Sequence, residues 1–189
     1  MYKIEDVKVT DLDESKYLKL QRIHYKQENI AKTWDITQAH DSVAILLYRE
    51  DSNEFILVKQ FRPAIYLQNE DGFTYELCAG IVDKDKSLKE IAKEEILEEC
   101  GYDIALDRIE KITSFHTSVG FAGARQSLFF AKVNESDIVS AGGGIENEMI
   151  ELVYLPIKEI KKFVLDENYV KTPGLMFAIH WFLEQKLYK

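Results

Sequence analysis

The sequence predicts a mixed α/β (α+β) fold that is preceded by a small antiparallel β appendage. The first forty residues alternate polar and apolar side chains, as half-buried strands do. Short apolar segments that are typical of strands lie on both sides of one clearly delimited helix. Two further helical segments close the chain. We therefore expect an appendage at residues 1–40 and a main domain at residues 41–189.

The strands expected in the main domain lie at residues 43–48, 55–61, 73–79, 109–114, 127–133 and 149–155. In the appendage we expect two or three strands, with a turn near Glu28 and Asn29. The last two helices are expected at about residues 157–165 and 173–186. The central helix has the clearest ends: Ser87 and Glu90 match a capping box, and Gly101 suits the left-handed residue after a helix.

Composition limits the possible partners. Of the 189 residues, 24 are Lys or Arg and 33 are Asp or Glu, so the formal net charge is −9. This balance argues against nucleic acid as a partner, because neutralising phosphates takes Lys and Arg. It leaves open a small phosphate-bearing substrate, since a divalent metal ion can supply positive charge locally.

Three further features of the sequence indicate the cellular compartment of the protein. The most apolar stretch, residues 175–183, is too short to span a membrane and contains His180. The N-terminal residues carry several acidic side chains and resemble no secretory signal. The two cysteines, Cys78 and Cys100, cannot make a disulfide framework. We therefore expect a cytoplasmic protein with no membrane partner.

The central helix carries carboxylates on the face that should pack against the sheet. Ile91, Ala92 and Ile96 define its apolar face. At about 100° per residue, Glu95 and Glu99 point within roughly 20° of Leu88, near the middle of that face. Inward carboxylates are unfavourable unless a cation compensates them, and Mg²⁺ prefers oxygen ligands. The alternative is an ordinary acidic helix that exposes its glutamates to solvent.

Residues 80–102 resemble the Nudix box, the signature of hydrolases that cut nucleoside diphosphates linked to another group. The box reads Gly, five residues, Glu, seven residues, Arg-Glu, an aliphatic residue, any residue, Glu-Glu, any residue, Gly, and an aliphatic or aromatic residue. The residues in register are Gly80, Glu95, Ile96, Glu98, Glu99, Gly101 and Tyr102. Two positions differ: Lys86 replaces the first Glu, and Glu94 replaces the Arg that helps to hold the catalytic carboxylates in the family.

Segments outside the box extend the resemblance over nearly the whole chain. Residues 59–63 and 76–80 are similar to the branch that acts on nucleoside diphosphate sugars, and residues 40–43, 120–126 and 142–144 are closer still to UDP-glucose diphosphatases. The resemblance implies a Nudix fold, with a mixed β-sheet sandwiched by helices. It also implies hydrolysis of UDP-glucose to UMP and glucose 1-phosphate.

Two other functions stay open at this point. One is an ADP-ribose or ADP-sugar diphosphatase, and the other is a non-catalytic Nudix module that binds a nucleotide. The related ADP-ribose enzymes are dimers whose N-terminal strands complete the partner's site, so we expect a homodimer.

The resemblance also implies roles for single residues. The expected Mg²⁺ ligands, with Mn²⁺ as a substitute, are Glu95, Glu98, Glu99, Glu148 and the carbonyl of Ala79. Glu146 is the candidate general base and Glu98 a further catalytic residue. The alternative for Glu146 and Glu148 is a solvated acidic turn, although the neighbouring glycines favour a loop that closes over substrate. The expected substrate-binding residues are Arg62, Glu76, Arg125, Trp34 and Tyr17, the last two as aromatics that stack on the base.

Overall fold

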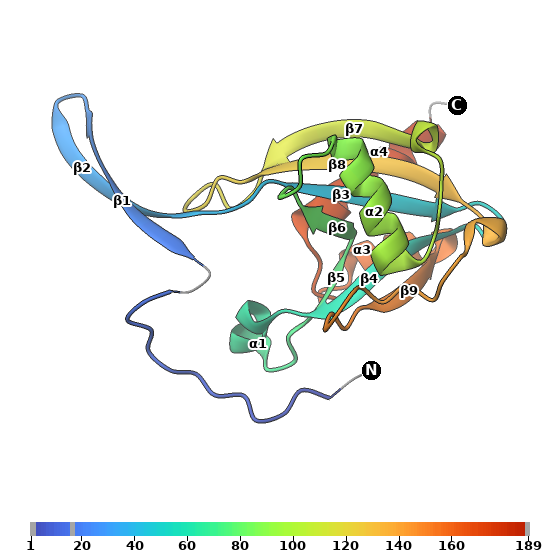
Figure 1. Cartoon of the computed structure of the whole chain (residues 1–189), viewed down its shortest axis with the longest axis horizontal. Coiled ribbons are helices and arrows are strands. Elements are labelled where there is room, and N and C mark those ends of the chain that lie inside the picture. Colours follow the sequence, from blue (N-terminus) through green and yellow to red (C-terminus); the bar gives the residue numbers. More distant parts are fainter. Residues whose placement is uncertain (1–2, 16–17, 188–189) are drawn as a thin grey trace.

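The structure is a computed structural model that describes residues 3–15 and 18–187 (Figure 1). It contains a two-stranded hairpin and a seven-stranded mixed sheet with helices on both faces, which confirms the predicted fold class. The strands are β1 (Lys19–Gln27), β2 (Ile30–Gln38), β3 (Ser42–Arg49), β4 (Glu54–Phe61), β5 (Phe73–Glu76), β6 (Cys78–Ile81), β7 (Ile109–His116), β8 (Arg125–Val133) and β9 (Glu151–Pro156). The α-helices are α1 (Pro63–Asn69), α2 (Leu88–Cys100), α3 (Ile160–Leu165) and α4 (Pro173–Leu187).

The sheet has the order β5-β4-β3-β8-β7, with β6 paired to β3 and β9 paired to β4. β3 and β8 run parallel, whereas the other strand pairs of the described sheet are antiparallel. Side chains of β3 alternate between two cores: Val43, Ile45 and Leu47 face α2, while Ala44 and Leu46 face α3 and α4. Burial on both faces explains why β3 is an unbroken apolar run.

β3 and β4 pair with each other only at one end, where Leu47–Arg49 meets Glu54–Ile56. Beyond that point the two strands separate, and a new strand is added to each: β6 pairs with β3, and β5 pairs with β4. The prediction of one strand at residues 73–79 is therefore wrong, because the chain changes its pairing partner at Leu77. The opening between β3 and β4 positions the functional site described below.

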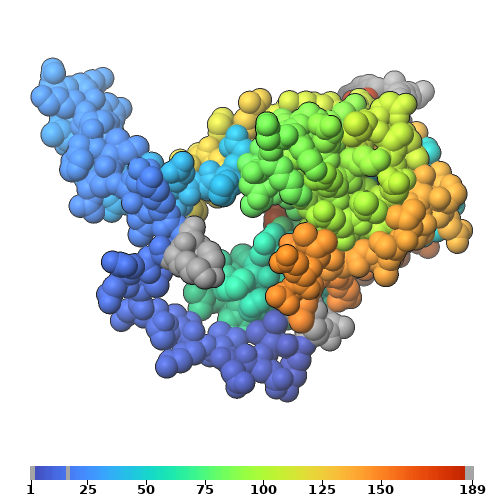
Figure 2. All heavy atoms as spheres, in the orientation of Figure 1, coloured from blue at the N-terminus to red at the C-terminus, as the bar shows by residue number. Residues whose placement is uncertain are grey.

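The hairpin of β1 and β2 extends away from the main body (Figure 2). Every residue of β1 is exposed, and most of β2 is exposed too. The two or three strands expected in the appendage are thus two in the described residues, and the turn lies at Glu28 and Asn29, as predicted. The boundary at residue 40 between appendage and main domain stays a prediction.

The helix ends agree closely with the sequence signals. Ser87 and Glu90 form the predicted capping box of α2, and Gly101 ends the helix at φ 79°. The sequence did not predict α1, which has seven residues and buries none of them. Within the described ranges, no helix is both long enough and apolar enough to cross a lipid bilayer.

Candidate active site

A cleft of about 500 Å³ lies where β3 and β4 separate. It is lined by residues from β3, β4, β5, β6 and β8, from the C-terminal half of α2, and from the loop after residue 140. Among the predicted site residues, those that line it are Arg62, Glu76, Ala79, Glu95, Glu98, Glu99 and Glu148. Arg62 and Glu148, which are eighty-six positions apart in the chain, therefore line one cavity, which no single sequence window could show.

α2 presents its carboxylates to this cleft, as the helical spacing predicted. Glu99 lies on the buried face of the helix with Ile91 and Ile96 and is 5% exposed. Burial raises the pKa of Glu99 to about 8, although a hydrogen bond from the Ala79 N–H opposes the shift. Burial also raises the pKa of Glu95 to about 7, and the charge of Glu98 adds to this effect. The site thus holds acidic groups whose charge is poorly compensated.

These observations fit a divalent cation. The donor set is made of carboxylate oxygens, which hard cations such as Mg²⁺ prefer, and a cation would stabilise the ionised form of Glu95 and Glu99. Gly80 faces Glu95 so closely that a Cβ atom there would lie 2.0 Å from the Glu95 Oε1 atom. Within the described residues, however, no three His, Cys, Asp or Glu side chains are already arranged as a metal site.

The glycine-rich loop holds the C-terminal end of α2. The N–H of Gly143 donates to the Glu99 carbonyl at 2.8 Å, and the N–H of Gly144 donates to the Glu98 carbonyl at 3.1 Å. Gly142 has φ 65°, and a Cβ there would lie 2.4 Å from the Glu99 carbonyl oxygen. Glycine is needed here for conformation and close approach. The mobility expected of this loop stays a prediction.

Arg62 and Glu76 form a bidentate ion pair at one side of the cleft. Arg62 Nε and Nη2 each donate to a Glu76 oxygen at 2.8 Å, and Thr74 Oγ1 donates to Glu76 at 2.5 Å. Burial alone would raise the pKa of Glu76, but the hydrogen bonds and charge of Arg62 bring it below the ordinary value. Arg62 keeps further donors that can contact phosphate.

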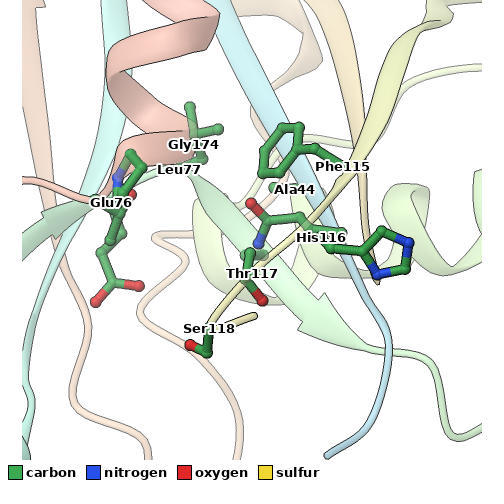
Figure 3. Close-up of a pocket in the computed structure, with 12 residues that line it drawn as sticks. Ala44, Glu76, Leu77, Phe115, His116, Thr117, Ser118 and Gly174 are labelled. Atoms are coloured by element: carbon green, nitrogen blue, oxygen red, sulfur yellow. The ribbon is translucent and has the colours of Figure 1, made fainter. Parts of the chain in front are cut away.

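A second cavity of about 350 Å³ adjoins the cleft and shares Glu76, Ala79 and Gln126 with it. Glu76 lies on one side of this cavity, and Thr117 and Ser118 lie on the other (Figure 3). The N-terminal residues of α4 complete the lining. The lining combines these polar groups with apolar side chains such as Leu77 and Phe115, as ligand pockets commonly do.

The other predicted residues lie outside the cleft. Glu146 is exposed on the turn before β9, at φ 53°, two residues from Glu148, which does line the cleft. Arg125 is exposed at the start of β8. Trp34 is 56% exposed on the hairpin, and its Nε1–H donates to the Gly120 carbonyl at 2.6 Å. Tyr17 lies outside the described residues.

The cavity-lining residues Thr117 and Ser118 were not predicted from the sequence, and no role was predicted for Phe121, although it lies in the segment 120–126 that carries part of the resemblance. They belong to the loop between β7 and β8, which the hairpin contacts: the Thr37 N–H donates to the Phe121 carbonyl at 2.8 Å. The glycines at 120 and 123 were the available signal, since they mark a turn.

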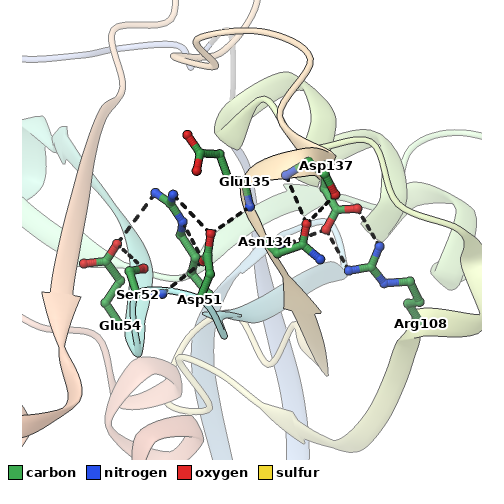
Figure 4. A network of polar contacts seen from close by, with 9 residues as sticks. Asp51, Ser52, Glu54, Arg108, Asn134, Glu135 and Asp137 are labelled. Atoms are coloured by element: carbon green, nitrogen blue, oxygen red, sulfur yellow. Dashed lines mark hydrogen bonds and ion pairs between the residues drawn. The ribbon is translucent and has the colours of Figure 1, made fainter.

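A polar network at the end of the sheet away from the hairpin provides a contrast (Figure 4). Arg108 binds both oxygens of Asp137 at 2.7 Å, and Asp137 also accepts from the Asn134 N–H at 2.9 Å. The side chain of Arg108 lowers the pKa of Asp137 against a smaller effect of burial. Asp51 is likewise paired with Arg49. These carboxylates are paired with arginine side chains, whereas burial outweighs the favourable contacts of Glu95 and Glu99 and raises their pKa values.

The mixed sheet, its flanking helices and the carboxylate-bearing α2 define a domain of the NUDIX class, and the sequence pattern of the NUDIX domain matches residues 38–173. The chain belongs to the Nudix family of hydrolases. It is 37% identical to the uridine diphosphate glucose pyrophosphatase NUDT14 of Bos taurus, over 96% of this chain and 95% of that protein. It is also 37% identical to the GDP-mannose pyrophosphatase of Salmonella typhimurium, over 72% of this chain and 76% of that protein.

The fold comparison agrees with this assignment. The crystal structure of an ADP compounds hydrolase matches with a TM-score of 0.69 and covers 94% of this chain and 90% of its own. Sequence identity is 12%, so this likeness concerns the fold alone.

Proposed function

We propose that this protein hydrolyses the pyrophosphate bond of a nucleoside diphosphate sugar, and that its substrate is UDP-glucose, which yields UMP and glucose 1-phosphate. The observation that carries the proposal is the pair of inward carboxylates, Glu95 and Glu99, whose raised pKa values mark uncompensated charge at the cleft. Support for the substrate comes from NUDT14 of Bos taurus, a uridine diphosphate glucose pyrophosphatase similar over nearly all of both chains.

A divalent metal ion, which we propose to be Mg²⁺ with Mn²⁺ as a substitute, would neutralise the pyrophosphate oxygens and acidify a bound water. Glu95, Glu98, Glu99, Glu148 and the Ala79 carbonyl would hold it. Among these, Glu98 is also the proposed second catalytic residue, because it faces the same cleft without being deeply buried.

The protein's own groups carry the remaining steps. Arg62 would bind a phosphoryl oxygen, with Glu76 fixing the direction of its guanidinium group. Glu146 would accept the proton of the attacking water as the loop closes, the new P–O bond forms to that water, and the bridging P–O bond breaks to release a phosphorylated product. The second cavity gives room for one end of the substrate, and Arg125 is proposed as a further contact.

We also propose that two chains associate through the hairpin, so that Trp34 and Tyr17 stack on the nucleotide base. Trp34 is large, exposed and next to the β7–β8 loop that borders the second cavity. A hairpin with solvent on both faces is marginal alone, which favours a partner surface. The cytoplasmic location expected from the sequence stays a prediction.

A turnover screen tests the function. UDP-glucose, GDP-mannose, ADP-ribose and ADP-glucose are incubated with the protein and Mg²⁺, and products are identified by mass. We expect UMP and glucose 1-phosphate as the fastest products. GDP-mannose is included because the Salmonella typhimurium relative is a GDP-mannose pyrophosphatase. Binding of all four without turnover would instead assign a nucleotide-binding module with no catalytic activity.

A further inference from the structure

The two residues that differ from the box contact each other. Lys86 Nζ forms an ion pair with Glu94 Oε1, and Lys84 Nζ lies 3.1 Å from Glu94 Oε2. Each oxygen of one carboxylate therefore binds one lysine. The chain has a basic residue where the box has an acidic one and an acidic residue where the box has a basic one, and these two residues form an ion pair.

Lys84 is the member of this group that reaches the cleft. It lines the cleft together with Glu95 and Glu98, whereas Lys86 does not. The side chain of Lys84 is 41% exposed, so its ammonium group is accessible from solvent. Its charge also opposes the effect of burial on Glu95, which places the ammonium group within electrostatic range of the carboxylates of α2.

The cleft thus has two cations on separate elements. Arg62 follows β4 and is bound by Glu76, while Lys84 lies between β6 and α2 and is bound by Glu94. Neither Glu76 nor Glu94 belongs to the proposed metal ligands. Each cation is therefore restrained by a carboxylate outside the metal cluster, and restraint lowers the entropy lost when a flexible side chain binds a ligand.

We propose that Lys84 is a second phosphate-binding cation of the cleft, and that Glu94 is the residue that positions it. This inference rests on the proposed function for the nature of the ligand, a diphosphate. A diphosphate carries charge on two phosphoryl groups, and Arg62 and Lys84 supply one cation for each. Lysine binds phosphate as a point charge, so it needs only to be held near the oxygens. Lys86 pairs with the other oxygen of Glu94 and so offsets part of the charge that Glu94 adds to the acidic cluster near Glu95.

The test measures binding of methylenediphosphonate, which cannot be hydrolysed, by calorimetry in the presence of Mg²⁺, together with KM and kcat for UDP-glucose. K84M should weaken binding and raise KM by roughly ten- to hundredfold, the value of one charge-assisted hydrogen bond. K84R should bind within about threefold of the wild type, because it keeps the charge.

A matched control and a double variant distinguish direct binding of the diphosphate by Lys84 from an indirect effect, in which the lysine ion pair only stabilises α2. K93M removes a lysine of α2 that pairs with Asp103 at 3.0 Å and does not line the cleft, so binding should be unchanged. E94Q should weaken binding less than K84M does, and K84M/E94Q should be no worse than K84M, because Glu94 acts through Lys84.

Two results would overturn the inference: K84M binding methylenediphosphonate as tightly as the wild type, or K93M losing as much affinity as K84M. The outcome is separable from the proposed function. If the wild type hydrolyses UDP-glucose while K84M is unaffected, this inference fails alone. If the wild type hydrolyses no nucleotide sugar but K84M still loses diphosphonate binding, the substrate assignment fails and the role of Lys84 holds.

Discussion

The carboxylate of Glu99 accepts a hydrogen bond from the backbone N–H of Ala79 at 2.9 Å. This contact joins α2 to β6 and holds a nearly buried acidic group at the edge of the cleft. A backbone N–H stabilises the carboxylate form only partly, since burial still raises the pKa of Glu99 to about 8.

Glu99→Gln should remove most of the turnover while the protein stays folded. The substitution keeps the size of the side chain and an oxygen that can accept from Ala79, but it removes the charge that a hard cation requires. Turnover at saturating Mg²⁺ and thermal unfolding of the metal-free protein measure the two effects. Glu110→Gln on the exposed part of β7 is the control. Near wild-type turnover for Glu99→Gln would exclude Glu99 from the ligand set.

The metal-free protein should lose stability as the pH rises from about 5 to about 9. The folded-state pKa values of Glu99 and Glu95, about 8 and about 7, lie above the ordinary glutamate value. At a pH below the ordinary glutamate pKa, both groups are protonated and contribute fully to the free energy of unfolding. This contribution is lost as the pH rises through their folded-state pKa values, about 7 and about 8. For Glu99 it amounts to at most about 4–5 kcal/mol. Urea unfolding in chelator should show the loss, and Glu99→Gln should reduce it; an unchanged slope in that variant would contradict the assignment.

Mg²⁺ affinity should rise with pH over the same range. A cation must displace the protons that Glu95 and Glu99 hold near neutral pH, so binding releases protons. Affinity should increase up to about tenfold per pH unit for each proton displaced. Calorimetric titration in two buffers of different ionisation enthalpy measures the number of protons released. Zero released protons at neutral pH would mean that the metal binds elsewhere.

Glu146→Gln should lower turnover by roughly 10²–10⁴ with little change in metal or substrate binding, if Glu146 is the general base. Glu146 is exposed, so the loop must carry it towards the cleft in the substrate complex. Glu148→Gln, by contrast, should weaken metal affinity, because Glu148 already lines the cleft. Should Glu148→Gln or Glu151→Gln reduce kcat far more than Glu146→Gln does, the base lies at one of those positions.

Removal of residues 1–40 should give a monomer or an insoluble chain with much weaker substrate binding. The hairpin exposes Leu20, Ile23 and Trp34, and a second copy of the chain can cover them. Sedimentation of the intact and truncated proteins at micromolar concentration, alongside KM, tests this. Trp34→Ala in the intact chain separates stacking from assembly, since it should raise KM and leave the dimer in place. An intact protein that is a monomer with full activity would exclude a shared site.

Local signals in the sequence predicted the central helix well, because each of its ends is determined by residues that lie close to that end in the chain. Ser87 and Glu90 cap one end, and Gly101 ends the other, as their residue types require. The inward direction of Glu99 followed from helical spacing alone. The sheet was predicted less well: the break at Leu77 arises from separation of β3 and β4, which depends on long-range pairing.

The contact between Lys86 and Glu94 could have been found in the sequence. Both residues differ from the box, their charges are opposite, and the two changes compensate each other. The contacts of the glycine loop with α2 could not have been found in the sequence, because nothing near residues 142–144 indicates which helix end they approach. The second cavity could not be predicted from the sequence either, because its lining residues come from distant parts of the chain, including β3, the β7–β8 loop and the start of α4.

The hydrogen bonds from Gly143 and Gly144 to the carbonyls of Glu98 and Glu99 mean that the box is not a self-contained unit. A helix with the same glutamates, grafted into another protein without this loop, would fray at the turn that carries them. Substitution of these glycines would likewise loosen the last turn of α2 without altering any of its carboxylates. The last turn of α2 thus depends on backbone contacts with a loop that lies far away in the sequence.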